Sequence, residues 1–340
     1  MKFTKNILWL TISTLSLGVF AAIPVGAETT NANAAQGIEI SPALVELNAQ
    51  RGGTYNITLH IRNVTNTDLV YTASTDDFNS ADETGSPHII TNSTLPATAS
   101  VRTWVSTASQ ISIAKQQLQV VNAQITVPTN AEPGGHYGVL RFSGGAPNVE
   151  QTGVGLSASV GVLLLIKVDG QITESASVAS FYTANSDKQT SFFEKSPITF
   201  VTRIKNDGNI HVKPTGSIEI RDMFGNLVKT MSINEDKSNV LPSSIRRFDT
   251  TFDGGWMIGR YTANLALGYG TTGQALTRTI SFWVIPYKII LAGLLILTTI
   301  IFILSRMVKV YNKHIINKHI TAKSTNENTT KSKKSSSKKD

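Results

Sequence analysis

The stretch Tyr55–Asn63 reads YNITLHIRN, and its side chains alternate between apolar and polar with a period of two. The apolar positions are Tyr55, Ile57, Leu59 and Ile61, and the polar positions between them are Asn56, Thr58, His60 and Arg62. Successive side chains of a β-strand point to opposite faces of its sheet. The pattern therefore predicts a strand with one buried face and one face in water.

Similar runs recur along the chain and predict an all-β outer portion. Tyr261–Tyr269 alternates in the same way, whereas Gly161–Val168 (GVLLLIKV) is apolar except for Lys167, as expected of a strand buried on both faces. Short strands separated by turn residues are typical of β-sandwiches, and about 250 residues suffice for two of them. We expect a short linker at 28–36, a distal sandwich at 37–171 and a membrane-proximal sandwich at 172–285.

Both ends of the chain carry apolar segments. In residues 1–27, two lysines precede an apolar run and Val25-Gly26-Ala27 provides small residues for cleavage, which predicts a secretory signal peptide. An uncleaved membrane anchor is the alternative. Near the other end, Ile289–Ser305 is seventeen residues long without a charge. It predicts a transmembrane helix at 286–306 with Trp283 and Tyr287 at the interface, in preference to a buried core helix.

The charge of the chain is unevenly distributed. The net charge is +8, and the segment after Ser305 alone has ten basic and two acidic residues. The portion 28–286 has 18 basic and 21 acidic residues, or −3. The basic balance thus reflects a tail at 307–340, expected to be disordered and cytoplasmic, and gives no reason to expect a nucleic-acid partner. We expect a single-pass cell-membrane protein with an extracellular N-terminus.

The chain has no cysteine, which excludes thiolate catalysis and cysteine-ligated metals. For an exported protein this is typical of a Gram-positive-type envelope more than of an animal cell surface. The sequons at Asn56, Asn63 and Asn92 are then interpreted as chance occurrences in strands rich in Thr and Asn.

The stretch Val127–Phe142 (VPTNAEPGGHYGVLRF) could be a ligand loop or a turn. A phosphate loop needs a helix after its glycines. Here the residues after Gly135 alternate as in a strand, and Pro133-Gly134 suits the centre of a type II turn. We therefore predict a turn leading into a strand.

Other candidate sites are weaker. The acidic stretch at 76–85 could hold Ca²⁺, but its spacing does not match an EF-hand and a solvated loop is favoured. Ser112 and Lys115 form an isolated Ser-x-x-Lys without the partner motifs of a β-lactamase. The histidines lack paired metal-binding spacing; they are His60, His88, His136, His211, His314 and His319. We nominate no catalytic residue, metal or cofactor and expect a protein that is not an enzyme.

The chain resembles bacterial surface proteins of the WxL-interacting type. The resemblance extends from Gln36 to about Lys313, and its distinctive stretches are Pro133–Gly138 (PGGHYG) and Asn206–Gly216 (NDGNIHVKPTG). It implies two tandem immunoglobulin-like sandwiches followed by a membrane span and a basic tail. In that family the first domain is implicated in binding peptidoglycan and the second in binding a host or partner protein.

These observations favour a membrane-anchored adhesion or scaffolding protein that binds a cell-wall polymer or another surface protein. The loops at 78–87 and 144–153 are the contact sites expected first, because rigid sandwiches present variable loops. A mechanical spacer, an assembly factor for surface proteins and an envelope hydrolase are the alternatives.

Overall fold

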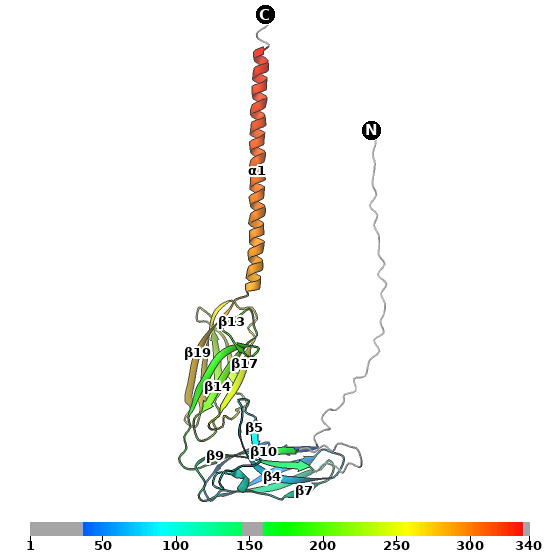
Figure 1. The fold of residues 1–340 in the computed structure, drawn as a ribbon, viewed down its shortest axis with the longest axis vertical. Helices are drawn as coiled ribbons and strands as arrows, with labels where there is room; N and C mark the ends of the chain where they lie inside the picture. The colour runs from blue at the N-terminus through cyan, green and yellow to red at the C-terminus, as the bar shows by residue number, and fades with distance from the viewer. Residues whose placement is uncertain (1–36, 145–158, 336–340) are drawn as a thin grey trace, which may run out of the picture.

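The computed structural model describes residues 37–144 and 159–335 (Figure 1). The predicted signal peptide, the linker at 28–36 and most of the loop at 144–153 lie outside these ranges. Two β-sandwiches follow each other along the chain and lie crosswise, and a long C-terminal helix leaves the far end of the second (Figure 1). The fold is thus all-β and immunoglobulin-like, with one apolar helix, as the sequence predicts.

The N-terminal sandwich contains the strands between residues 38 and 168. Its first sheet has the order β1 (Ile38–Ser41), β3 (Thr54–Asn63), β8 (Leu118–Thr126) and β6 (Val105–Ser106). Its second sheet has the order β2 (Leu44–Ala49), β10 (Ser159–Val168), β9 (Gly134–Gly144), β4 (Leu69–Ser80) and β5 (Pro87–Ile90), with β7 (Gln110–Ile113) also on β4 and a short 3₁₀ helix, η2 (Val101–Thr103), nearby. The pair β2–β10 is parallel, and the other pairs are antiparallel.

The C-terminal sandwich contains the strands between residues 176 and 284. One sheet has the order β12 (Lys188–Gln189), β11 (Ala176–Asn185), β14 (Ile198–Asn206) and β17 (Ile245–Phe252). The other has the order β13 (Phe192–Phe193), β19 (Gln274–Val284), β18 (Gly259–Tyr269), β15 (Thr215–Arg221) and β16 (Leu227–Ile233).

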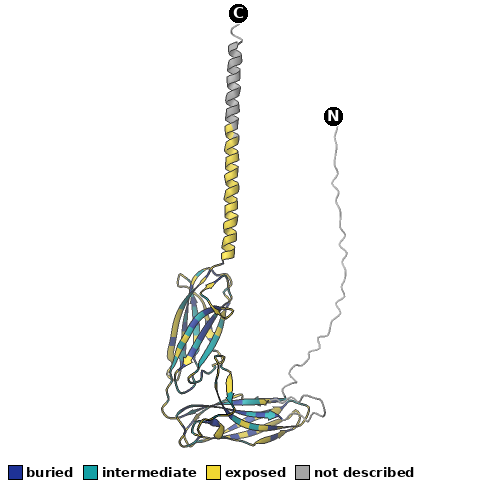
Figure 2. Ribbon diagram, viewed as in Figure 1, coloured by how far each residue is buried: buried dark blue, intermediate teal, exposed yellow. Residues whose placement is uncertain are grey.

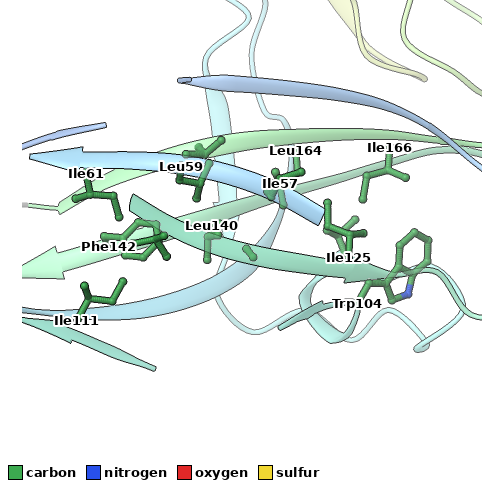
Figure 3. Close-up of a cluster of buried hydrophobic side chains, with 14 of the residues drawn as sticks. Ile57, Leu59, Ile61, Trp104, Ile111, Ile125, Leu140, Phe142, Leu164 and Ile166 are labelled. Atoms are coloured by element: carbon green, nitrogen blue, oxygen red, sulfur yellow. The ribbon is translucent and has the colours of Figure 1, made fainter. Parts of the chain in front are cut away.

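The cores follow the alternation seen in the sequence. In β3 the side chains of Ile57, Leu59 and Ile61 are buried, and Figure 3 shows them facing residues of the opposite sheet such as Leu140 and Phe142. The polar side chains between them face water. The prediction for this strand is therefore confirmed, and Figure 2 shows the same mixture of buried and exposed positions along both sandwiches.

Strand β10 is buried on both faces, as its unbroken apolar run predicts. Leu164 and Ile166 point into the N-terminal core, whereas Leu165 belongs to a separate small cluster on the outside of the same sheet. A strand covered on both sides needs a second layer over its outer face. Part of that layer comes from the C-terminal sandwich, as described below.

Each sandwich has a fully buried asparagine at the end of a strand. Asn63 donates to the carbonyls of Thr67 and Ile113 and accepts the N–H of Thr65. Asn206 donates to the carbonyls of Ile210 and Val240, both at 2.8 Å, and accepts the N–H of Gly208. Each amide therefore holds the loop that leaves its strand, and the sequon at Asn63 is buried within the protein.

The C-terminal helix α1 (Tyr287–Ser335) follows β19 after two intervening residues. It is long and apolar enough to cross a membrane over Tyr287–Lys313. The helix continues to Ser335, whereas the sequence predicts a disordered tail from residue 307. The physical reason is that no Gly or Pro interrupts residues 307–335, so a helix already nucleated in the apolar segment can propagate.

We predict that Asn206→Ala lowers the free energy of unfolding by about 3 kcal/mol, because it removes the three hydrogen bonds that this buried amide makes with Ile210, Val240 and Gly208. Thermal unfolding of the full chain in detergent, followed by circular dichroism, measures the loss. Asn185→Ala, at the exposed end of β11, is the control and should change stability by less than about 0.5 kcal/mol. Equal effects of the two substitutions would contradict the role given to Asn206.

Candidate functional site

The two stretches that carry the family resemblance meet where the sandwiches touch, a region called here the junction. The N–H of Gly135 at the start of β9 donates to the carbonyl of Asn209 at 2.8 Å. A Cβ on Gly134 would lie 2.9 Å from the same oxygen, and Gly134 has a φ of +126°. Both observations explain why glycine suits this position: the backbone of another domain approaches too closely for a side chain.

The prediction for Val127–Phe142 is confirmed in part. A strand follows the glycine pair, and no helix begins there, so the stretch is not a phosphate loop. The hydrogen bond of a type II turn would join Gly135 to Glu132, but Gly135 bonds Asn209 instead. The carbonyl of Glu132 faces the buried ring of His136 at 2.9 Å. The tertiary contact thus replaces the local one.

An aromatic contact lies beside this backbone bond. The hydroxyl of Tyr137 is 3.3 Å from Nδ1 of His211, and the two rings meet edge to face at 5.8 Å. Burial lowers the pKa of His211, although the negative charge of Glu46 acts in the opposite direction. Burial also raises the pKa of Tyr137. Both groups are therefore neutral near pH 7, which suits a contact largely removed from water.

A small apolar cluster joins the sandwiches. Phe78, Val139 and Leu165 on the outer face of the N-terminal sandwich are buried, and Leu241 of the C-terminal sandwich packs against them. The ring of Phe78 also meets Tyr137 edge to face at 5.9 Å. This is the second layer that covers β10, and it gives the junction an apolar centre beside its polar bonds.

The acidic stretch at 76–85 does not form a freely solvated loop. The carboxylate of Glu83 makes a bidentate contact with Arg203, with Nε at 2.7 Å, and its backbone oxygen accepts the N–H of Arg247 at 2.8 Å. Gly85, with a φ of +80°, lies against the guanidinium of Arg246, where a Cβ would collide. The prediction of a solvated loop is therefore wrong for this end of the stretch, because it spans the junction (Figure 1).

The other carboxylates of this stretch have separate partners. Asp76 pairs with Arg141 at 2.6 Å, Asp77 accepts the hydroxyl of Ser100 at 2.7 Å, and Asp82 accepts Thr84. Within the described residues, no group of three or more His, Cys, Asp or Glu side chains is placed to hold a metal ion. The stretch is therefore better described as structural than as a calcium loop.

A pocket of about 640 Å³ opens at the junction between the two sandwiches. Asn48 of β2 and Lys167 of β10 are direct neighbours in the parallel register and line one side. Glu174 and the β18–β19 turn line the other side, where Oε2 of Glu174 accepts the N–H of Thr271 at 2.7 Å and its hydroxyl at 2.9 Å. The size is typical of a site for a small molecule or a segment of a polymer.

An ion pair between the sandwiches lines the same pocket. Glu46 accepts Nζ of Lys213 at 2.6 Å and the side-chain amide of Asn239 at 3.2 Å. Burial acts to raise the pKa of Glu46, but the bonds from Lys213 and Asn239 and the charge of Lys213 outweigh it and lower the pKa. Glu46 therefore stays ionised and bound to a cation near pH 7. The chemistry of the pocket therefore suits hydrogen bonding and the recognition of charged groups.

The remaining candidates are not brought together. His136 is buried, with its two ring nitrogens each 2.9 Å from a backbone carbonyl and its ring 4.6 Å from that of Trp104. Ser112 lies in β7, and the N–H of Lys115 in the next turn donates to Asp68. Of the loop at 144–153, residues beyond Gly144 lie outside the described ranges.

Several junction residues were not predicted from the sequence, namely Glu46, Arg203, Leu241, Arg246 and Arg247. A weak signal existed for one of them. Leu241 follows the polar stretch Asn234–Asn239, where an apolar residue is unexpected in a solvated connection.

No protein-family model matches the chain, and no curated protein matches its sequence. Solved structures do match its fold. The class 5 fimbrial chaperone CfaA is 12% identical, with 71% of this chain and 98% of that chain covered and a TM-score of 0.37. The CupB2 chaperone of Pseudomonas aeruginosa is 13% identical, with coverages of 72% and 100% and a TM-score of 0.33. A Salmonella enterica complex of the SafA pilin with the SafB chaperone is 11% identical, with coverages of 72% and 96% and a TM-score of 0.33. At this identity the likeness concerns the fold alone.

We predict that Leu241→Asp loosens the junction while both sandwiches remain folded, because a carboxylate cannot be buried in the apolar cluster without a partner. Spin labels on Ser106→Cys and Lys229→Cys, one in each sandwich of the cysteine-free chain, should give a broader distance distribution by pulsed EPR. Leu118→Asp makes the same change at an exposed position and should leave the distribution unchanged. A narrow distribution in the Leu241→Asp chain would contradict the proposed role of the cluster.

We also predict that the junction weakens on mild acidification. The pKa of His211 is lower in the folded chain than in water, so its contribution to stability is complete above about pH 6.5 and declines as the pH falls from there toward the folded pKa. Glu46 and Glu83 have lowered pKa values, so their contributions decline only below about pH 4.5. The same label pair should therefore report broadening between pH 7.5 and pH 5.5. His211→Gln should remove this pH dependence, and its persistence in that variant would contradict the assignment.

Proposed function

We propose that this chain is a non-enzymatic surface protein, held in the cell membrane by α1 with its N-terminus outside, that binds a cell-wall polymer or another surface protein. The observation that carries the proposal is the polar pocket at a junction joined by hydrogen bonds, ion pairs and an apolar cluster. A binding site between two domains that are held together so closely is already organised before its ligand arrives, which lowers the entropic cost of binding.

The chemistry of the pocket supports a polar ligand. Asn48, Lys167 and Thr271 offer an amide, an ammonium group and a hydroxyl at its lining. The carboxylates of Glu46 and Glu174 are already bound by groups of the same chain. Peptidoglycan presents hydroxyls, amides and carboxylates, and these could pair with such groups. The same arrangement gives no exposed pair of free carboxylates for hydrolysis at this pocket.

The resemblance to WxL-interacting proteins supports the same proposal. Its two distinctive stretches, 133–138 and 206–216, are distant in the sequence, yet they make the backbone and aromatic contacts of the junction. Two stretches so far apart in the sequence would share one role if their contacts maintain a single arrangement of the two sandwiches. We propose that this arrangement presents the pocket to the wall or to a partner.

A mechanical spacer or an assembly factor is the second candidate. The observation in its favour is the same firmly joined junction, together with the two-residue connection between β19 and α1. Both features would hold a partner at a defined height above the membrane without a specific ligand in the pocket.

We predict that the full chain in detergent co-sediments with purified Gram-positive peptidoglycan. The double variant Asn48→Ala/Lys167→Ala should weaken binding by about tenfold, equivalent to about 1.4 kcal/mol. Thr58→Ala/Asn122→Ala changes a hydrogen-bonded pair on the outer face of β3 and β8, and Lys229→Ala changes an exposed residue of β16. Both should bind as the unaltered chain does.

Two outcomes would contradict this proposal. Protein that remains in the supernatant would exclude peptidoglycan as the ligand, and unchanged binding by the pocket variant would exclude the pocket. Crosslinking in intact envelopes followed by identification of the captured proteins would then test the assembly-factor alternative.

A further inference from the structure

Several turns of the C-terminal sandwich meet at the end from which α1 leaves, called here the membrane end. Gly259 at the start of β18 lies opposite Val284 at the end of β19, so the β17–β18 loop is beside the connection to the helix. Arg221 at the end of β15 lies opposite Thr262, which brings the β15–β16 turn to the same end. The methyl of Met223 in that turn reaches the position where Gly259 would carry a Cβ.

The membrane end gathers exposed apolar side chains. Trp256 and Phe224 are 85% and 81% exposed at the tips of the β17–β18 loop and the β15–β16 turn, and Ile258 is 62% exposed. Among the described residues of the C-terminal sandwich, the exposed large apolar side chains all lie at or near this end; they are Phe192, Met223, Phe224, Leu227, Val228, Trp256, Ile258, Trp283 and Ile285. A patch of this kind marks an interaction surface.

The opposite end of the same sandwich has a different character. Its β18–β19 turn contains Thr271 and Thr272, and the loop after β16 contains Glu235, Asp236 and Lys237, which are exposed. The apolar side chains are therefore not a general property of this domain's loops. They gather on the side of the helix.

The start of α1 is tied to the sandwich by short connections. Ile285 and Pro286 alone separate β19 from α1, and two residues span at most about 7 Å. The N–H of Ile285 donates to the carbonyl of Phe193 at 2.8 Å, and Lys288 pairs with Glu194 at 2.7 Å. The sandwich therefore cannot move far from the first turn of the helix.

Trp256 lies next to that first turn. Together with Met257, it lines a pocket of about 340 Å³ whose other walls include Pro286 and Ile289. Tyr287 is 58% exposed at the same level. Tryptophan and tyrosine favour the boundary between the headgroups and the acyl chains, where the ring is in an apolar medium and its polar atom remains hydrated.

We propose that the membrane end is a lipid-binding surface, in which Phe224, Trp256 and Ile258 enter the interfacial layer of the outer leaflet around α1. The proposal rests on the proposed membrane span. A bilayer is the occupant that fits, because the patch is continuous with the apolar surface of α1 and lies within the reach of a two-residue connection. With the helix and two separate loops in the bilayer, the C-terminal sandwich has a fixed tilt above the membrane.

Site-directed spin labelling of the full chain in phosphatidylcholine vesicles tests the proposal, since the chain has no cysteine of its own. Labels on Phe224→Cys and Trp256→Cys should collide more with oxygen and less with a water-soluble nickel complex than a label on Thr272→Cys at the opposite end. A label on Leu295→Cys in the middle of the apolar segment is the reference for the bilayer interior.

The outcomes separate this proposal from the one it rests on. If Leu295→Cys is inside the bilayer while positions 224 and 256 match Thr272→Cys, the lipid-binding surface is refuted and the span stands. If Leu295→Cys is also in water, the span itself is refuted and the surface with it.

A second measurement uses the native Trp256 as the probe, so that the unaltered chain is examined as well as its variants. Lipids brominated on their acyl chains should quench part of the tryptophan emission of the unaltered chain in vesicles. The quenched part should decrease in Trp256→Phe and persist in Trp104→Phe, because Trp104 is buried in the N-terminal sandwich. Equal quenching in the unaltered chain and in Trp256→Phe would overturn the proposal.

Discussion

The contact between the backbones of Gly135 and Asn209 is the constraint on which the arrangement of this molecule depends. A carbonyl of one sandwich and an N–H of the other can meet at 2.8 Å only where no side chain intervenes. That approach brings Tyr137 against His211 and Leu241 onto the outer face of β10. It also brings Lys213 to Glu46, so that the ion pair, the apolar cluster and the pocket form around one backbone bond.

The fold was largely predictable from the sequence, because its evidence is local. The alternation in Tyr55–Asn63 assigns each side chain of β3 to a face of the sheet, and the apolar run of β10 indicates cover on both sides. The continuation of α1 beyond residue 306 was harder to predict, because the lysines and serines of this segment are also typical of disordered tails. Helix propagation depends on what precedes the segment as much as on its own composition.

The junction could not be predicted in the same way, because its contacts join residues far apart in the chain. The glycine pair at 134–135 indicated a local turn, but the backbone there is bonded to Asn209 of another domain, which no local rule identifies. Glu83 belonged to a stretch that reads as a solvated acidic loop, and its partner Arg203 is an unremarkable residue of a strand. The resemblance to a family singled out the stretches 133–138 and 206–216, yet it does not say that they touch.

The pairing of β2 with β10 has a consequence for the behaviour of this protein among its neighbours. β2 lies in parallel along β10 and occupies the flank that this central, apolar strand would otherwise leave open. An open flank of such a strand would invite pairing with other chains, so its closure discourages self-association. The edge left to the outside is instead β2 itself, which is six residues long and carries Glu46 at its middle, already committed to Lys213. The strand with the unbroken apolar run is therefore not exposed as an edge that could seed aggregation.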